Sequence, residues 1–326
     1  MIETDENKMD SQTSSIHYSR SNGELEILGA GAFGKVYRGI WNDREIVIKK
    51  PLLENSPVVN KHLMLLWKNE IKMQASLSHP NIVSMLGYHT NEIDPAQSYI
   101  LFELVKLGDL IDLLNTTVHN FSWLDFTFIL LGIANALHFL HEKHILHRDV
   151  KAENILIELH NNRYESKLGD FGFAVQLKAS EDCFISAEQA GTRSSSAPEV
   201  LAQGIYSDKS DVYGIAIICY ILTARRFPFP SPRSPEDSPS SIASASIPKQ
   251  FIELMDCCFV PERTQRPSAA EILQFSIFKG LPQPQAISKQ SKYEEKPHIA
   301  VALDQQGFPI ESPEISPHSS ICCAIS

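Results

Sequence analysis

The sequence predicts an α+β fold in which short strands come first and helices follow. After residue 24, short apolar runs are interrupted by glycines, a pattern typical of hairpin strands. Between Val58 and Leu77 the apolar residues recur at helical spacing. From Trp123 to His141 the chain is apolar on nearly every face, which indicates a helix buried inside the protein. A small strand-rich part is therefore expected to precede a larger, mostly helical part.

The bulk composition narrows the function classes. The chain has 326 residues, and a hydrophobic content of 43% is sufficient for a sizeable core. A net charge of −10 argues against nucleic acid as a partner, because phosphate backbones attract basic surfaces. The six cysteines include no C-x-x-C spacing, so the sequence predicts neither a zinc site nor a disulfide framework and favours a reducing compartment. The first residues are acidic where a signal peptide would be basic.

Three short motifs concentrate the chemistry. His147 to Asn154 reads H-R-D-V-K-A-E-N, a density of charged and titratable side chains that core packing does not explain. Asp170 to Gly172 reads D-F-G, and Gly29 to Val36 reads G-A-G-A-F-G-K-V. Together and in this order, the motifs resemble the signature set of eukaryotic-type protein kinases, with a serine/threonine, tyrosine-kinase-like character.

This resemblance covers residues 24–279 and implies the two-lobed protein kinase fold. A small N-lobe with an antiparallel sheet and one helix would precede a larger, mostly helical C-lobe, with ATP and Mg²⁺ bound between them. Residues 229–248 are rich in serine and proline and are expected to form a loop. The predicted organisation is a flexible leader over 1–23, an N-lobe over 24–104, a C-lobe over 105–279, a disordered linker over 280–321 and a lipidation motif over 322–326.

The resemblance assigns nucleotide-binding residues along much of the chain. The glycines of the Gly-rich stretch would let backbone N–H groups approach phosphate oxygens. The strand-like run before Glu103 and Val105 resembles the hinge, where main-chain groups hydrogen-bond adenine, with Phe102 as gatekeeper. For Asp109 a ribose contact and a simple helix cap both stay open. The predicted set is Gly29, Ala30, Gly31, Ala32, Phe33, Gly34, Val36, Val47, Lys49, Glu103, Val105, Asp109, Asn154, Leu156 and Asp170.

Lys49 and Glu70 are predicted to form an ion pair. Lys49 ends a strand that resembles the V-A-I-K strand of kinases and would pair with the α- and β-phosphates. Glu70 falls within the apolar stripe of the helix expected over 58–77, and a carboxylate on a buried face is costly unless it meets a cation. The resemblance supplies Lys49 as that cation. The alternative is a glutamate at the helix edge that reaches water.

The catalytic roles also follow from the resemblance. Asp149 would accept the proton of the substrate hydroxyl, and Lys151 would stabilise charge at the transferring phosphoryl group. Asn154 and Asp170 would hold the magnesium ions. A lysine two residues after the catalytic aspartate is the pattern of serine/threonine kinases. His147 is expected to be a packed structural histidine, since Asp149 already fills the role of base.

Residues 191–199 resemble the end of a kinase activation segment. Thr192 is expected to touch the catalytic loop, and Ser195 replaces the usual tyrosine. Kinases with an arginine at the position of Arg148 commonly wait for a phosphate on this segment. One hypothesis is that Glu188 substitutes for the phosphate, giving constitutive activity. Ser186 and Ser194, Ser195 and Ser196 are rival phosphorylation sites.

The resemblance also predicts two structural contacts, and the sequence departs from the kinase pattern at several positions. Asp211 is expected to bind the catalytic-loop backbone, and Arg266 to pair with Glu199. Val47 stands where kinases usually have alanine, and Gln74 stands one turn beyond Glu70, where they have an apolar residue. With Ser195, these departures keep open the alternative of a pseudokinase that acts as a membrane-recruited scaffold. A dual-specificity kinase is a second alternative, which Lys151 disfavours.

The last residues match a lipidation motif. Cys323-Ala324-Ile325-Ser326 fits the C-a-a-X rule for prenylation, and serine at the last position favours farnesyl. One prenyl chain gives only reversible attachment, so Cys322 is the candidate for a second, palmitoyl chain. The expected partners are a protein substrate, a prenyltransferase and a membrane surface, with the protein peripheral on the cytoplasmic face.

Overall fold

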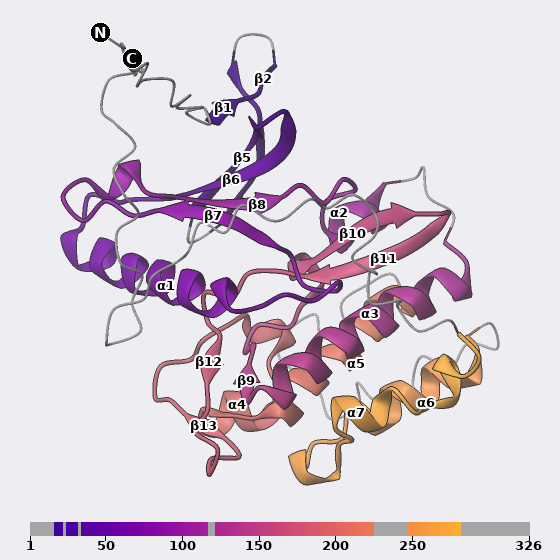
Figure 1. Cartoon of the computed structure of the whole chain (residues 1–326). Coiled ribbons are helices and arrows are strands. Elements are labelled where there is room, and N and C mark those ends of the chain that lie inside the picture. Colours follow the sequence, from indigo (N-terminus) through magenta and orange to yellow (C-terminus); the bar gives the residue numbers. More distant parts are fainter. Residues whose placement is uncertain (1–15, 22–23, 32–33, 117–120, 225–246, 282–326) are drawn as a thin grey trace, which may run out of the picture. The chain divides into compact units, whose positions relative to one another are not determined.

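The computed structural model describes residues 16–21, 24–31, 34–116, 121–224 and 247–281. The chain divides into two compact units. The described part of the first unit is 16–55 with 86–104, and that of the second is 56–85 with 105–281. Figure 1 labels the elements of both units.

The first unit is built on one sheet whose strands do not follow chain order. In the sheet the order is β1-β5-β6-β8-β7, and β4 also pairs with β5. The pairs β1–β5, β4–β5, β5–β6 and β6–β8 are antiparallel. The strands are β1 Ile16–Tyr18, β4 Ile27–Gly31, β5 Gly34–Trp41, β6 Arg44–Pro51, β7 Met85–His89 and β8 Tyr99–Glu103, with the short pair β2 Arg20–Ser21 and β3 Glu24–Leu25 and the 3-10 turn Pro95–Gln97 beside them.

Turn chemistry and a small core fix this sheet. Asn42 and Asp43 join β5 to β6 with positive φ angles of 50° and 58°, a conformation that asparagine and aspartate tolerate in two-residue hairpins. Ile46 and Ile48 on β6 pack with Leu101 on β8 to form the core under the sheet. The register places these residues on neighbouring strands, since Ile48 lies opposite Leu101.

The strand β1 corrects part of the predicted leader. Residues 16–21 fall within the range 1–23 that was predicted to be flexible, yet Ile16 pairs with Trp41 and Tyr18 with Gly39 on β5. The ring of Tyr18 also packs edge-on against Tyr37, with the ring centroids 5.7 Å apart. The aromatic contacts and the free edge of β5 explain the strand, because an unpaired edge is a template for further pairing. The remaining leader residues lie outside the described part of the chain.

The second unit is mostly helical. It contains α1 Pro57–Ala75, α2 Leu110–Asn115, α3 Trp123–Glu142, α4 Pro198–Gln203, α5 Asp208–Ala224, α6 Lys249–Cys258 and α7 Ala269–Ile272. Its strands are β9 Ile145–Leu146, β10 Ile155–His160, β11 Arg163–Leu168, β12 Val175–Gln176, β13 Phe184–Ile185 and β14 Ile205–Tyr206. Short 3-10 turns occupy Ala152–Asn154, Arg193–Ser195, Arg263–Gln265 and Ser276–Phe278. The strands form the two-stranded pairs β10–β11, β9–β12 and β13–β14.

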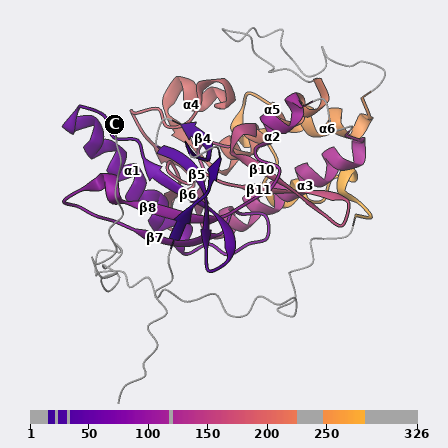
Figure 2. The ribbon, with the colours of Figure 1, turned by 90° about the horizontal axis from the view of Figure 1, so that it is seen from above.

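Helix α3 is the centre of this unit. It begins with a capping box in which Ser122 and Asp125 each bind the backbone N–H of the other. Its apolar residues line the core on most sides, which confirms the predicted buried helix. Among the described residues, α3 is the helix that is long and apolar enough to span a membrane, but most of it is buried inside the protein. Figures 1 and 2 show α3 beside α5, and α5 beside α6.

A glycine lets α3 approach the hairpin β10–β11. A side chain at Gly132 would collide with the hydroxyl of Ser166 on β11. That hydroxyl donates a hydrogen bond of 2.8 Å to the carbonyl of Ile129, one turn earlier on α3. The hairpin itself turns at Asn161 and Asn162, which both have positive φ angles. Helix α3 therefore packs closely against β10 and β11. These strands lie between the motif that ends at Asn154 and the motif that begins at Asp170.

A buried ion pair holds the end of the activation segment to the helices. The guanidinium of Arg266 donates to both carboxylate oxygens of Glu199, at 2.7 and 2.8 Å, as the sequence predicted. It also donates to the carbonyls of Lys209 and Pro261. Because the charges meet in a bidentate arrangement with further hydrogen bonds, their burial is compensated.

The sheet of the first unit and the helices of the second confirm the predicted fold class. Helix α1, which falls within the range 24–104 predicted as the N-lobe, groups with the second unit. Met73 on α1 belongs to the same hydrophobic core as α3 and β10. The change of unit after residue 104 coincides with the predicted boundary.

His79 makes the stability of the second unit depend on pH. Its ring stacks on Phe139 of α3 at 4.8 Å, and its Nδ1 accepts the backbone N–H of Asn81. Burial, with a smaller effect from His138, lowers the pKa of His79 to about 4. Since the unfolded chain binds the proton more readily, the free energy of unfolding should fall as the pH drops from about 6.5 towards 4.

The variant His79→Gln should reduce this pH dependence, because glutamine does not titrate. Chemical denaturation of the parent and the variant at pH 7, 6, 5 and 4.5 measures the slope. His62→Gln, at an exposed position on α1, is the matched control and should keep the parental slope. A parental slope in His79→Gln would show that another group is responsible.

Candidate active site

The carboxylate of Asp149 is held by donors from the catalytic loop and the activation segment. Its Oδ1 accepts the backbone N–H of Thr192 at 2.9 Å. Its Oδ2 lies 2.9 Å from Nζ of Lys151 and accepts Nδ2 of Asn154 at 3.1 Å. Lys151 also donates to the hydroxyl of Thr192 at 2.8 Å, which confirms the predicted contact of Thr192 with the catalytic loop. These bonds keep the carboxylate in one orientation although it is almost fully buried.

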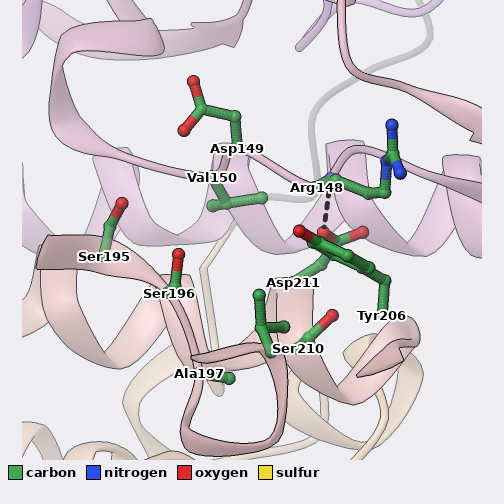
Figure 3. Close-up of a pocket in the computed structure, with 10 residues that line it drawn as sticks. Arg148, Asp149, Val150, Ser195, Ser196, Ala197, Tyr206, Ser210 and Asp211 are labelled. Atoms are coloured by element: carbon green, nitrogen blue, oxygen red, sulfur yellow. Dashed lines mark hydrogen bonds between the residues drawn. The ribbon is translucent and has the colours of Figure 1, made fainter. Parts of the chain in front are cut away.

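The backbone of the catalytic loop is fixed from below by Asp211 on α5. One oxygen of Asp211 accepts the N–H of His147 and the other accepts the N–H of Arg148, both at 2.9 Å. This confirms the predicted contact between Asp211 and the loop backbone. Arg148 has a φ angle of +66°, a strained conformation for a residue with a side chain, and the two bonds help to hold it. Figure 3 shows Asp211 beneath Arg148 and Asp149, with a dashed line for its bond to Arg148.

Asp211 stays ionised although it is fully buried. Burial by itself would raise the pKa of Asp211, but the hydrogen bond and charge of His141, with the nearby His147, hold the pKa below its ordinary value. His141 Nε2 lies 3.0 Å from the carboxylate. Sequence reasoning did not identify His141, which lies at the end of the predicted α3 stretch without a motif of its own. His141 lies on α3 and Asp211 on α5, so only the folded structure shows that the two side chains are in contact.

His147 is a packed structural residue, as predicted. It is completely buried, and its Nε2 lies 3.0 Å from the carbonyl of Gly169. Its Nδ1 accepts the backbone N–H of Asp149. The ring of Phe171 packs edge-on against it at 4.9 Å. His147 therefore joins the catalytic loop to the start of the activation segment.

Asn154 and Asp170 supply oxygen ligands of the kind that Mg²⁺ prefers. The amide nitrogen of Asn154 donates to the carbonyl and carboxylate of Asp149, which leaves its amide oxygen as the group for a cation. The carbonyl of Asn154 accepts the N–H of Gly169, so the residues before Asp170 are bonded directly to the catalytic loop. Asp170 has a φ angle of +60°. One carboxylate and one amide fit Mg²⁺, which completes its shell with water and phosphate oxygens.

The predicted nucleotide residues of the first unit lie on its central strands. Val36 on β5 lies opposite Lys49 on β6, and Lys49 lies opposite Ile100 on β8. Val47 is paired with Phe102, the predicted gatekeeper. A side chain at Gly34 would collide with the backbone carbonyl of Lys50, so the close approach of β5 and β6 requires glycine there.

The other predicted positions in the Gly-rich stretch differ in what the structure describes. A side chain at Gly29 or Gly31 would point into open space, so strand packing does not require these glycines. Ala30 pairs with Lys35 in the hairpin. Ala32 and Phe33 lie outside the described residues. Packing within the sheet therefore does not explain the glycines at positions 29 and 31.

The remaining predicted residues belong to both units. Glu103 ends β8 in the first unit, whereas the buried Val105 belongs to the second. Asp109 is the N-cap of α2, because its Oδ1 accepts the N–H of Asp112 at 2.9 Å. It also forms an isolated bridge with Leu156. The cap interpretation of Asp109 is thus confirmed, and a ribose contact stays a prediction.

The Lys49–Glu70 pair also stays a prediction, since the two residues lie in different units. Glu70 is 3% exposed on α1, so the alternative of a water-exposed glutamate at the helix edge is wrong. Gln74, one turn later, is buried as well and donates to the carbonyl of Val83 at 3.0 Å. The polar side chain at this usually apolar position therefore has a hydrogen-bond partner of its own.

Arg148 does not pair with Glu188. Its Nε donates to the carbonyl of Phe173 at 2.6 Å, and its guanidinium lies between the rings of Phe184 and Tyr206, at 4.8 and 5.0 Å from their centroids. Glu188 is exposed, and within the described residues it makes no ion pair. The geometry thus gives the hypothesis of a fixed carboxylate no support. Sequence reasoning missed Phe184 and Tyr206, because neither belongs to a motif.

Ser195 and Asp149 both line a small pocket. Ser195 is buried and donates to the carbonyl of Thr192 at 3.1 Å, and Ser196 donates to the same carbonyl at 2.8 Å. The pocket has a volume of about 20 Å³, enough for one water molecule. Figure 3 shows Ser195, Ser196 and Asp149 on one side of it and Tyr206 with Asp211 on the other.

The sequence of the chain was compared with family models and with curated proteins. The model of the protein kinase domain matches residues 23–278. The chain belongs to the protein kinase family. The probable serine/threonine-protein kinase drkD of Dictyostelium discoideum is 31% identical over 291 residues, which cover 87% of this chain and 21% of that protein.

Two further relatives come from a plant and from the same amoeba. A probable receptor-like protein kinase of Arabidopsis thaliana is 32% identical over 235 residues, covering 70% of this chain and 45% of the relative. The probable serine/threonine-protein kinase drkC of Dictyostelium discoideum is 28% identical over 256 residues, covering 76% of this chain and 33% of the relative. The chain thus spans between about a fifth and just under half of the length of these kinases.

The variant Asp211→Asn should loosen the catalytic loop. The amide oxygen can accept one of the two backbone N–H groups, but the amide nitrogen would face the other N–H as a second donor, so the free energy of unfolding at pH 7 should fall by about 1.5–3 kcal/mol. Because the folded-state pKa of Asp211 is lowered, its stabilisation is present above its ordinary pKa and is lost as the pH falls through the lower folded value. The difference between parent and variant should therefore shrink below about pH 4.

Urea denaturation from pH 7 to pH 3 measures this difference. Asp43→Asn, in the exposed β5–β6 turn, is the control and should match the parent. A constant difference between parent and Asp211→Asn over the whole range would contradict the assignment of the charge to Asp211.

Proposed function

We propose that the chain is an ATP- and Mg²⁺-dependent protein kinase that transfers the γ-phosphoryl group to serine or threonine hydroxyls of proteins. The observation that carries this proposal is the carboxylate of Asp149, oriented by Thr192, Lys151 and Asn154. The names of the relatives and the lysine two residues after Asp149 favour serine and threonine as acceptors. Membership of the kinase family supplies ATP as the phosphoryl donor.

In this mechanism Asp149 positions the substrate hydroxyl and accepts its proton as the hydroxyl oxygen bonds to the γ-phosphorus. The bond between that phosphorus and the bridging oxygen breaks, and ADP leaves with the bridging electrons. Lys151 offsets the negative charge that develops on the phosphoryl oxygens. Asn154 and Asp170 would hold Mg²⁺, which when bound neutralises charge on the phosphates. Lys49, paired with Glu70, would contact the α- and β-phosphates.

A pseudokinase scaffold is the main alternative, and three departures from the kinase pattern keep it open. Val47 adds bulk where kinases usually have alanine, Gln74 is polar, and Ser195 is small. Each departure has a local accommodation, since Val47 sits in regular register and both Gln74 and Ser195 are hydrogen-bonded. The presence of Lys49, Glu70, Asp149, Asn154 and Asp170 together favours an active enzyme over a scaffold.

Phosphate transfer from labelled ATP with Mg²⁺, to the protein itself and to a generic protein substrate, tests the proposal. Asp149→Asn removes the proton acceptor and should lower kcat by about 10²- to 10⁴-fold. Glu188→Ala is the matched control on the activation segment and should keep the parental rate, because Glu188 does not contact Arg148. A parental rate there would reject Glu188 as a phosphate substitute.

Phosphoamino-acid analysis of the same reactions separates the alternatives. Label on serine or threonine in the parent supports the proposal, whereas label on tyrosine as well would establish dual specificity. No label in the parent, with the protein folded and Mg²⁺ present, would overturn the enzyme proposal in favour of the scaffold.

We also propose that Cys323 is prenylated and that the kinase is thereby attached to the cytoplasmic face of a membrane. The support is the C-a-a-X pattern of residues 323–326, which lie outside the described part of the chain. Cys322 would carry a second lipid, since one prenyl chain gives only marginal binding.

Mass spectrometry of the intact protein isolated from its own cells tests whether Cys323 carries a prenyl group. A farnesyl mass that is lost in Cys323→Ser but kept in Cys322→Ser would support the proposal. In the same preparations, both variants should shift towards the soluble fraction. An unmodified mass in the parent would overturn the proposal.

A further inference from the structure

Three consecutive backbone carbonyls at the start of the activation segment are bonded to side chains from other elements. The amide nitrogen of Asn69 on α1 donates to the carbonyl of Gly172 at 3.0 Å and to that of Ala174 at 2.8 Å. The carbonyl between them, that of Phe173, accepts Nε of Arg148 at 2.6 Å. The segment that follows Asp170 is therefore held from two sides, by a helix and by the catalytic loop.

Asn69 uses the full donor capacity of its side chain in these bonds. An amide NH₂ group carries two hydrogens, and here each carbonyl can take one of them. Both carbonyls lie more than one hundred residues away in the sequence, so the contact is purely tertiary. Because the two acceptors are fixed, Asn69 cannot rotate without losing at least one bond.

The residues that flank Asn69 on helix α1 are buried. Trp67 and Ile71, two residues before and after Asn69, are 2% and 0% exposed. Glu70 is the next residue along the chain, so Asn69 and Glu70 are displaced together if α1 shifts. The bonds of Asn69 therefore link the position of Glu70 to the backbone that follows Asp170.

The receiving segment is short and locally rigid. The N–H of Ala174 returns to the carbonyl of Phe171 at 3.0 Å, forming a turn directly after Asp170. Val175 then pairs with Leu146 in the β9–β12 pair, next to the catalytic loop. Asp170 adopts a positive φ angle at the entrance to this turn, a conformation that persists only where the surroundings determine it.

We propose that Asn69 is a positioning residue that couples helix α1 to the metal-holding Asp170. When α1 is in place, Asn69 binds the carbonyls of Gly172 and Ala174 and the turn holds the carboxylate of Asp170 for Mg²⁺. When α1 moves, both bonds are lost together and the turn is released. This inference rests on the proposed kinase function for its effect on catalysis, but the coupling itself is a property of the fold.

Asn69→Ala and Asn69→Asp test the coupling by steady-state kinetics at a series of Mg²⁺ concentrations. Alanine removes both donors, so kcat/KM should fall about tenfold and the half-saturating Mg²⁺ concentration should rise. Aspartate has nearly the same shape but only acceptors, which would face two carbonyl oxygens, so the loss should approach about a hundredfold. Lys61→Ala, at an exposed position on α1, is the matched control and should behave like the parent.

Hydrogen exchange of the same proteins gives a readout that does not depend on activity. The amides of residues 171–177 should exchange faster in Asn69→Ala than in the parent and Lys61→Ala, while the amides of α3 should not change. Unchanged exchange in this segment would overturn the proposal whether or not the parent is active. If the parent transfers no phosphate but the segment exchanges faster, the proposed function fails and the coupling stands.

An active, folded Asn69→Asp variant with parental kcat/KM and a parental Mg²⁺ requirement would also overturn the proposal. A variant with lower thermal stability but parental Mg²⁺ dependence would assign Asn69 a merely structural role. The Mg²⁺ requirement therefore separates positioning from general destabilisation.

Discussion

The buried carboxylate of Asp211 is the interaction on which the catalytic loop depends. A charge in this position is tolerable only because two backbone N–H groups and His141 meet it. In return, the carboxylate holds Arg148 in a left-handed conformation that places Asp149 at the surface of the second unit's core. Loss of that charge would remove the reason for the loop to stay in this shape. Helix α5 thus acts as the foundation of the loop.

The contacts around Asp149 and those around Asp170 follow one physical rule. Side-chain and backbone donors bind carboxylate or backbone acceptors, and the bonds of Thr192 and Asn69 each join two elements that lie far apart in the chain. Thr192 ties the end of the activation segment to Asp149, and Asn69 ties its beginning to α1. The middle of the segment is held differently, by the stacking of Phe184 on Arg148. Neutral contacts therefore occupy the guanidinium of Arg148.

The sequence predicted the local features of this protein well. A long, almost wholly apolar run identified α3, and the motifs identified Asp149, Lys151 and Asn154, because these residues lie within a few positions of one another. The pairing of Arg266 with Glu199 was also predicted, although only through resemblance to a family. What these predictions share is a signal contained in a short stretch of chain. The strand β1 was missed, because it is three residues long within a polar, Ser-rich stretch and its stability comes from pairing with β5.

The residues that sequence reasoning did not find act across long distances in the chain. Three such residues lie in helices or strands that contain no recognisable motif, and only folding brings them to the site. They are Asn69, His141 and Tyr206. Tyr206 illustrates this, since its hydroxyl binds both the N–H and the carbonyl of Ala190 while its ring lies against Arg148. No local pattern distinguishes such a tyrosine from one that fills the core.

An inventory of lone pairs at Asp149 shows which oxygen can still accept a proton. An ionised carboxylate offers about four acceptor sites, two on each oxygen. Lys151 and Asn154 use the two on Oδ2, while Thr192 uses one on Oδ1. Among the donors that the described residues supply, none takes the second site on Oδ1. The carboxylate is therefore stereochemically unsymmetrical, and a substrate hydroxyl has one lone pair to approach.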